Sequence, residues 1–202
     1  MHGSAGWVGQ NPELAILVAF AAAIIEAVAV LGILLPGTPI LMAVAGAAAL
    51  AGMPIWPIMV VAVVGAVIGD FVSFWLGQRF SERLRGVWPL SRRPELMCQA
   101  EAFFRRYGTA SVAICRFVPV LRSTVPLVAG MAGMRRGRFL LANVLSACVW
   151  APAHVLPAQY AGLSLDRLEA GEWQPALFWL LAFAAVSGLG WLVHRRFRPQ
   201  AR

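Results

Sequence analysis

Four ionisable residues lie within or beside long apolar segments, and they restrict the fold of this chain more than any other feature. They are Glu26, Asp70, Arg116 and Arg122, and apolar residues surround each of them. A charged side chain at the centre of a bilayer costs about 2.5–3.5 kcal/mol on insertion scales. Such residues persist where they face a polar cavity, pair with one another or handle a charged ligand. Two carboxylates and two guanidiniums carry no net charge together, so they could neutralise one another until an anion arrives.

The composition indicates an integral membrane protein. Hydrophobic residues make up 60% of the 202 residues and the mean hydropathy is +0.73, whereas soluble chains are about 45–50% apolar. The formal net charge is +8, and all 17 basic residues are arginines. These arginines lie in short blocks between apolar segments, which is typical of membrane topology rather than of nucleic-acid binding. We therefore expect one all-α membrane domain over residues 1–202, with no nucleic-acid partner.

No catalytic or metal-binding motif stands out in the sequence. The three cysteines and three histidines are isolated from one another and lack metal-ligand spacing. Neither a Ser-His-Asp arrangement nor a phosphate-binding glycine loop is present. We expect no metal, no cofactor and no enzymatic activity.

Three segments are long and apolar enough to cross a bilayer of about 30 Å. They are residues 57–80, 139–161 and 175–193. Because arginine-rich loops prefer the cytoplasm, the basic tail at 194–202 is expected on the cytoplasmic side.

Two further segments are broken by proline and are predicted to form re-entrant hairpins. Residues 109–134 have arginine blocks at both ends and Pro119 and Pro126 inside, so they should enter from the cytoplasm and turn back. Residues 12–51, broken at Pro36, fit a second hairpin that enters from the opposite face. If residues 12–35 instead span the membrane fully, the N-terminus moves to the cytoplasmic side.

A connector and a weak internal repeat complete the predicted organisation. Residues 81–107 are the most polar stretch, and within them Pro94–Tyr107 has the pattern of an amphipathic helix on the membrane surface. Residues 12–80 and 108–162 share the order of a Pro break, a small-residue run, a Gly-Met pair and a long helix. Such halves in opposite orientation are typical of inverted-repeat transporters.

Several short motifs resemble the DedA family, also called the VTT or SNARE-associated domain. The resemblance covers residues 12–162, and its most specific part is the pattern R-F-x-P-x-x-R, which begins at Arg116 and ends at Arg122. The other matching motifs are Glu26, Leu35-Pro36-Gly37, Gly69-Asp70 with Gly77, Phe104 with Gly108, Ala129-Gly130-Met131, and Phe139 with Asn143 and Trp150.

The resemblance implies a multi-pass protein of the bacterial inner membrane with two opposed re-entrant hairpins. It implies lipid translocation, of undecaprenyl phosphate in some members and of phosphatidylethanolamine or related lipids in others, with a link to the proton motive force. Glu26, Arg116 and Arg122 fall on positions regarded as required in the family, and Asp70 falls on its G-D position. Thr38 departs from the family pattern, because many members carry an acidic residue there.

The two arginines are the first candidates for substrate binding. A guanidinium offers two parallel hydrogen bonds to phosphate oxygens and stays charged when desolvated. Arg116 and Arg122 could therefore bind a lipid phosphate, or they could be structural and pair with Glu26 or Asp70. Both roles are compatible, since an anion could displace the internal partners. The two carboxylates could carry protons or serve as permanent counter-ions.

Three hydroxyl residues complete the predicted site. Thr38, Ser123 and Thr124 could donate hydrogen bonds to a lipid headgroup, and capping of short helices is the alternative. The favoured function is a flippase for an anionic, phosphate-bearing lipid, with undecaprenyl phosphate first and other phospholipids next. The alternatives are a proton-coupled small-ion or solute transporter of the same fold, and a scaffold protein. Protons and a second copy of the chain stay open as partners.

Overall fold

The described part of the protein consists of helices joined by short connections. The computed structural model describes residues 2–32, 35, 37–84, 94–118 and 121–169, and no strand occurs within these ranges. The helices are α1 (His2–Gln10), α2 (Pro12–Ala27), α3 (Ala29–Gly32), α4 (Gly37–Leu50), α5 (Trp56–Leu84), α6 (Pro94–Tyr107), α7 (Thr109–Ile114), the 3-10 turn η2 (Cys115–Phe117), α8 (Thr124–Met131) and α9 (Arg136–Glu169). The all-α prediction is confirmed. The predicted helix at 175–193 and the tail at 194–202 lie outside the described residues.

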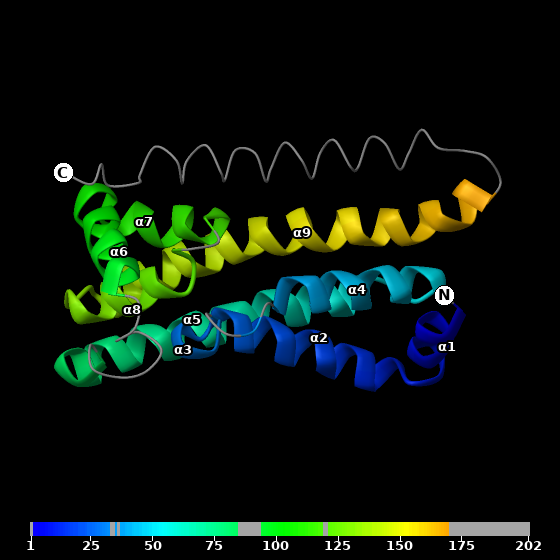
Figure 1. The fold of residues 1–202 in the computed structure, drawn as a ribbon, viewed down its shortest axis with the longest axis horizontal. Coiled ribbons are helices and arrows are strands. Elements are labelled where there is room, and N and C mark those ends of the chain that lie inside the picture. The colour runs from blue at the N-terminus through cyan, green and yellow to red at the C-terminus, as the bar shows by residue number, and fades with distance from the viewer. Residues whose placement is uncertain (1, 33–34, 36, 85–93, 119–120, 170–202) are drawn as a thin grey trace.

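The two long helices α5 and α9 run through most of the length of the molecule (Figure 1). Within the described ranges, Trp56–Ser81 and Arg136–Leu163 are long and apolar enough to cross a membrane. They correspond to the predicted segments 57–80 and 139–161. Helix α9 continues to Glu169, beyond the predicted end of this segment at residue 161.

Two pairs of short helices, α2 with α4 and α7 with α8, approach from opposite ends of the molecule. In Figure 1, α1 and the C-terminal end of α4 lie at one end, whereas α6, α7 and α8 lie at the other. The first helix of each pair packs against the long helix that follows it, α2 against α5 and α7 against α9. The second helix packs most extensively against the long helix of the other half, α4 against α9 and α8 against α5. The two halves thus exchange their second short helices.

The ends of α4 and α8 have the same geometry, which supports the internal repeat. Gly52 and Gly133 both have positive φ, at 68° and 70°. In the first half the N–H of Met53 donates to Ala48 O at 2.9 Å, and in the second half Met134 donates to Ala129 O at 3.1 Å. This is the Schellman cap, in which a left-handed glycine ends the helix. The repeated Gly-Met pair therefore marks two equivalent helix ends.

Glycines also allow the exchanged helices to lie unusually close to their partners. A Cβ atom at Gly130 of α8 would overlap the carbonyl oxygen of Phe74, and one at Gly77 of α5 would overlap that of Leu127. In the other half, a Cβ at Gly162 of α9 would overlap the carbonyl oxygen of Gly46. The small-residue runs thus bring backbone against backbone, as in other membrane helix pairs.

The amphipathic helix α6 begins and ends where the sequence predicts. Its apolar residues Met97, Ala100 and Phe103 are buried in one cluster with residues of η2 and α8, such as Cys115 and Val125. The apolar face of α6 is therefore covered by the protein. That this helix lies at the membrane surface stays a prediction.

The first apolar segment, expected as one stretch over 12–35, breaks after Ala27. Val28 has extended backbone angles, and α3 starts at Ala29. The hydroxyl of Ser73 on α5 hydrogen-bonds the backbone at this break. It accepts from the N–H of Ala29 at 2.8 Å and lies 3.1 Å from the carbonyl oxygens of Ala27 and Gly69. A buried break in a helix leaves backbone N–H and C=O groups that need hydrogen-bond partners, and the Ser73 hydroxyl serves as one.

Candidate functional site

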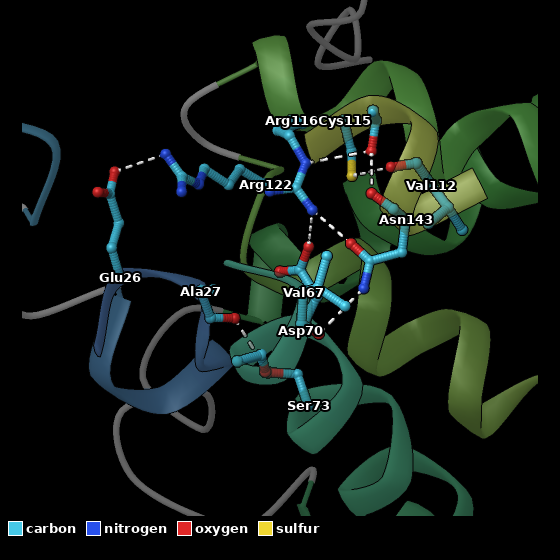
Figure 2. A network of polar contacts seen from close by, with 12 residues as sticks. Glu26, Ala27, Val67, Asp70, Ser73, Val112, Cys115, Arg116, Arg122 and Asn143 are labelled. Carbon is cyan, nitrogen blue, oxygen red and sulfur yellow. Dashed lines mark hydrogen bonds and ion pairs between the residues drawn. The ribbon is translucent and has the colours of Figure 1, made fainter. Parts of the chain in front are cut away.

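The four charged residues of the apolar segments gather where the two helix pairs meet. They form two neighbouring groups (Figure 2). We call them the Arg116 group, with Asp70, Asn143 and Ser146, and the Arg122 group, with Glu26 and Thr38. Side chains from α2, α4, α5, α9 and the broken segment after α7 thus converge at one place.

The Arg116 group is a buried ion pair with additional neutral hydrogen-bond partners. Arg116 Nη2 donates to Asp70 Oδ2 and to Asn143 Oδ1, and its Nε donates to Ser146 Oγ at 3.2 Å. The side chains of Arg116 and Asp70 are 2% and 8% exposed. A buried pair of this kind holds when further hydrogen bonds compensate the lost hydration. Asn143 and Ser146 supply them.

A second layer of hydrogen bonds fixes these two neutral partners. Asn143 Nδ2 donates to the carbonyl oxygen of Val67 on α5 at 3.1 Å. Ser146 Oγ donates to the carbonyl oxygen of Asn143 at 3.0 Å, one turn earlier in α9. Asn143 therefore links α9, α5 and Arg116, and its amide cannot turn without losing a bond.

The Arg122 group joins the tips of the two short helix pairs. Arg122 Nη1 donates to Glu26 Oε1 at 2.8 Å and to Thr38 Oγ1 at 3.1 Å. The Thr38 hydroxyl in turn donates to the Glu26 carboxylate, whose oxygens lie 2.6 and 2.7 Å away. Figure 2 shows Arg122 extended across to Glu26, away from Arg116. Thr38, which stands where many family members carry an acidic residue, thus contributes a hydroxyl that hydrogen-bonds the carboxylate of Glu26.

The glycine of the Pro-Gly break places Thr38 at this site. A Cβ at Gly37 would overlap the carbonyl oxygen of Ala22 and press on the side chain of Glu26. Only glycine lets the start of α4 come this close to α2. Pro36 itself, predicted to shape this tip, and Pro119 in the second tip lie outside the described residues.

Trp150 of α9 lies beside both guanidiniums. The Arg122 Cζ is 4.3 Å from the centre of its ring and the Arg116 Cζ is 5.9 Å away. The side chain of Trp150 is fully buried. A cation over an indole ring is attracted by its negative face, so the two arginine groups share one aromatic support.

Four buried donor atoms at this site lack a hydrogen-bond partner among the described residues. They are Arg116 Nη1, Arg122 Nε, Arg122 Nη2 and Trp150 Nε1. A buried unpaired polar group costs about 1–3 kcal/mol, and native structures contain few. All four are donors, so an acceptor-rich group would satisfy them.

The two arginines leave different parts of the guanidinium free. Arg116 uses Nε and Nη2 for protein partners and leaves Nη1. Arg122 uses Nη1 and leaves Nε with Nη2, which together form the edge that binds two oxygens of one anion. Arg116 is therefore anchored by its surroundings, whereas Arg122 keeps its two-pronged edge available.

Two short helices begin at the same place. Helix α4 starts at Gly37, beside Thr38, and α8 starts at Thr124, shortly after Arg122. The N-terminus of a helix carries unsatisfied N–H groups and a partial positive charge, which favour an anion. The side chain of Arg122, two residues before α8, reaches Thr38 in the first turn of α4. The first N–H groups of α8, those of Thr124 and Val125, already donate to the carbonyl oxygen of Leu121, so α4 is the helix whose start favours an anion here.

The remaining predicted site residues have local surroundings. Thr124 Oγ1 donates to the carbonyl oxygen of Leu121 at 3.3 Å, a local bond in the turn that precedes α8. Ser123 is buried, and its side chain makes no cap hydrogen bond at the start of α8. Across the described ranges, no group of three or more His, Cys, Asp or Glu residues could hold a metal ion.

The sequence analysis missed part of this arrangement. Asn143 and Trp150 entered the prediction only as part of the family motif, and Ser73 and Ser146 did not enter it. A signal was present, because Asn143, Ser146 and Trp150 share one face of α9 at helical spacing. Polar residues on one stripe of an apolar helix indicate a polar interior contact.

The chain is similar to known membrane proteins over most of its length. The family described as VTT domain matches residues 35–160, more than half of the chain. The inner membrane protein YabI of Escherichia coli is 31% identical over 195 residues, which cover 95% of this chain and 76% of that protein. An uncharacterized membrane protein of Mycobacterium bovis is 32% identical over 166 residues, covering 79% of this chain and 74% of that protein. No solved structure matches the chain.

Proposed function

Because the chain belongs to the VTT domain family, the DedA family of membrane proteins, we propose that it transports a phosphate-bearing lipid across the membrane. The anionic head is held between the two helix pairs by Arg122 with help from Arg116, while the lipid tail stays in the bilayer. Undecaprenyl phosphate is the substrate that we put first, and phosphatidylethanolamine or another phospholipid, moved by a flippase or scramblase, is the alternative.

The observation that carries the proposal is the free edge of Arg122. Within the described ranges its Nε and Nη2 atoms are buried and unpaired, and Arg116 and Trp150 nearby each carry a further unpaired donor. A phosphate offers several acceptor oxygens and fits the bidentate geometry of a guanidinium. The N-terminal end of α4, where Thr38 contacts Arg122, adds positive potential beside this edge.

The charge balance suggests how the head is received and released. Glu26, Asp70, Arg116 and Arg122 sum to zero, so an incoming anion needs compensation. Glu26 is the partner best placed to provide it, since its side chain is 14% exposed against 8% for Asp70. Glu26 either leaves Arg122 or takes up a proton when the phosphate binds, which would couple transport to the proton gradient.

The membrane placement follows from the same proposal. The helix pairs α2–α4 and α7–α8 act as re-entrant hairpins from opposite faces, and α5 and α9 cross the bilayer. The protein resides in a bacterial inner membrane with its C-terminal tail in the cytoplasm, where the arginine blocks favour it. The lipid reaches the site sideways, between the helices.

Reconstituted vesicles test this function. Purified protein in liposomes should accelerate the movement of a fluorescent polyprenyl phosphate between leaflets, and Arg122→Lys should reduce the rate at least about tenfold, because lysine cannot replace the two-pronged edge. The matched control is Arg138→Lys, since Arg138 is exposed. Wild-type protein that moves no phosphate lipid would end the proposal, and a solute transporter would instead show uptake of a soluble anion.

A further inference from the structure

We propose that Trp150 is a ligand-binding residue whose indole N–H donates to an unesterified oxygen of the bound phosphate. This inference rests on the function proposed above and adds a third donor to its site. The family resemblance gives no role to Trp150, so the argument comes from its contacts.

The first step is the position of the ring. The centre of the Trp150 ring lies 4.3 Å from the Arg122 Cζ and 5.9 Å from the Arg116 Cζ. An oxygen held by either guanidinium is therefore in the immediate surroundings of this side chain.

The second step is the state of the indole nitrogen. A buried tryptophan usually pairs its N–H, yet Trp150 Nε1 is buried without a partner among the residues that the structure describes. Its ring also packs on His154, 4.8 Å between ring centres, and the carbonyl oxygen of Trp150 lies 2.9 Å from His154 Nδ1. The ring is thus fixed by its neighbours while its single donor is left over.

The third step is the chemistry of the acceptor. The unpaired atoms are donors only, namely Arg116 Nη1, the free edge of Arg122 and Trp150 Nε1. A phosphate monoester has three unesterified oxygens. Two of them can bind the Arg122 edge, and the third can accept from Trp150 and Arg116 together. A terminal phosphate therefore satisfies all the donors, whether it belongs to a lipid or is free in solution.

The indole N–H resonance gives a direct test. Protein labelled with ¹⁵N in its tryptophans is purified in detergent micelles, and the Trp150 peak is the one absent from Trp150→Phe. A spin label on the exposed Cys148 in a Cys98→Ser background assigns the same peak without that variant. Farnesyl phosphate should move the peak downfield, as expected for a new hydrogen bond, and farnesol should leave it in place. A shift with inorganic phosphate as well would mean that the phosphate group alone suffices.

Affinity provides the second readout. Trp150→Phe keeps an aromatic ring but lacks the donor, so farnesyl phosphate should bind about tenfold more weakly, as expected for one lost hydrogen bond to a charged group. The matched control is Trp56→Phe, because Trp56 is 66% exposed at the start of α5, and its affinity should equal that of the wild type.

The outcomes separate this inference from the proposed function. An unmoved Trp150 peak, an equal shift with farnesol, or unchanged affinity in Trp150→Phe would overturn the assignment of Trp150. If the wild type still transports phosphate lipids in that case, the proposed function stands without it. If the peak moves but no lipid is transported, the phosphate contact stands and the transport proposal fails.

Discussion

Replacing Asp70 by asparagine should destabilise the protein strongly, because it removes the counter-charge of Arg116. Both side chains of this pair are nearly inaccessible, at 8% and 2% exposure. In Asp70→Asn the guanidinium keeps only the neutral partners Asn143 and Ser146. A buried charge without its partner costs about 3–5 kcal/mol, and we expect the free energy of unfolding to fall by that amount.

A double-mutant cycle separates the ion pair from other effects of the substitution. Arg116→Gln alone leaves the Asp70 carboxylate unpaired and should cost a similar amount. The double variant Asp70→Asn with Arg116→Gln carries no charge at this pair, while the Arg122–Glu26 pair is unchanged, so its loss should be smaller than the sum of the single losses by at least about 2 kcal/mol.

The assay is reversible unfolding of the purified protein in mixed micelles, followed by circular dichroism. Glu95→Gln is the control, because Glu95 is exposed on α6, and it should change the unfolding free energy by less than about 0.5 kcal/mol. The reasoning is refuted if Asp70→Asn costs less than about 1 kcal/mol, or if the single losses simply add.

Two further predictions use the same unfolding assay. Ser73→Ala removes the acceptor of the Ala29 N–H at the break after α2, so the free energy of unfolding should fall by about 1–3 kcal/mol; an unchanged value would mean that the break needs no side-chain partner. Gly130→Ala places a Cβ against the carbonyl oxygen of Phe74 and should cost about 1–3 kcal/mol through overpacking. Gly137→Ala is its control, because among the described residues no atom outside the neighbouring backbone of its own helix lies within 4 Å of that Cβ, and equal losses in the two variants would contradict the close crossing of α8 and α5.

The sequence predicts much of this fold because its strongest signals are local. Proline, glycine and runs of apolar residues mark helix ends wherever they occur. Helix α6 has the predicted bounds, and the proline-rich middle of residues 109–134 is indeed broken. The break at Val28 could not be predicted in this way. No proline or glycine marks it, and it depends on Ser73, which is distant in the sequence.

The candidate site could also be predicted only where its signals are local in the sequence. Charged residues within apolar segments are conspicuous, and the sequence analysis named all four, together with the alternative that they pair internally. Which arginine pairs with which acid depends on how the helices face one another. The sequence left that open, whereas the structure pairs Arg116 with Asp70 and Arg122 with Glu26. Neutral partners such as Asn143 gain their role only from this packing.

The exchange of short helices between the halves limits how the site can open. Helix α4 packs on α9, and α8 packs on α5, so each half holds a helix of the other and the two halves are interlocked. Swinging one half away from the other would pull both glycine crossings apart at once. Small sliding of packed helices along each other keeps such contacts. Access to the buried arginines from either face would then come from shear along α5 and α9, during which the contacts of α4 with α9 and of α8 with α5 persist.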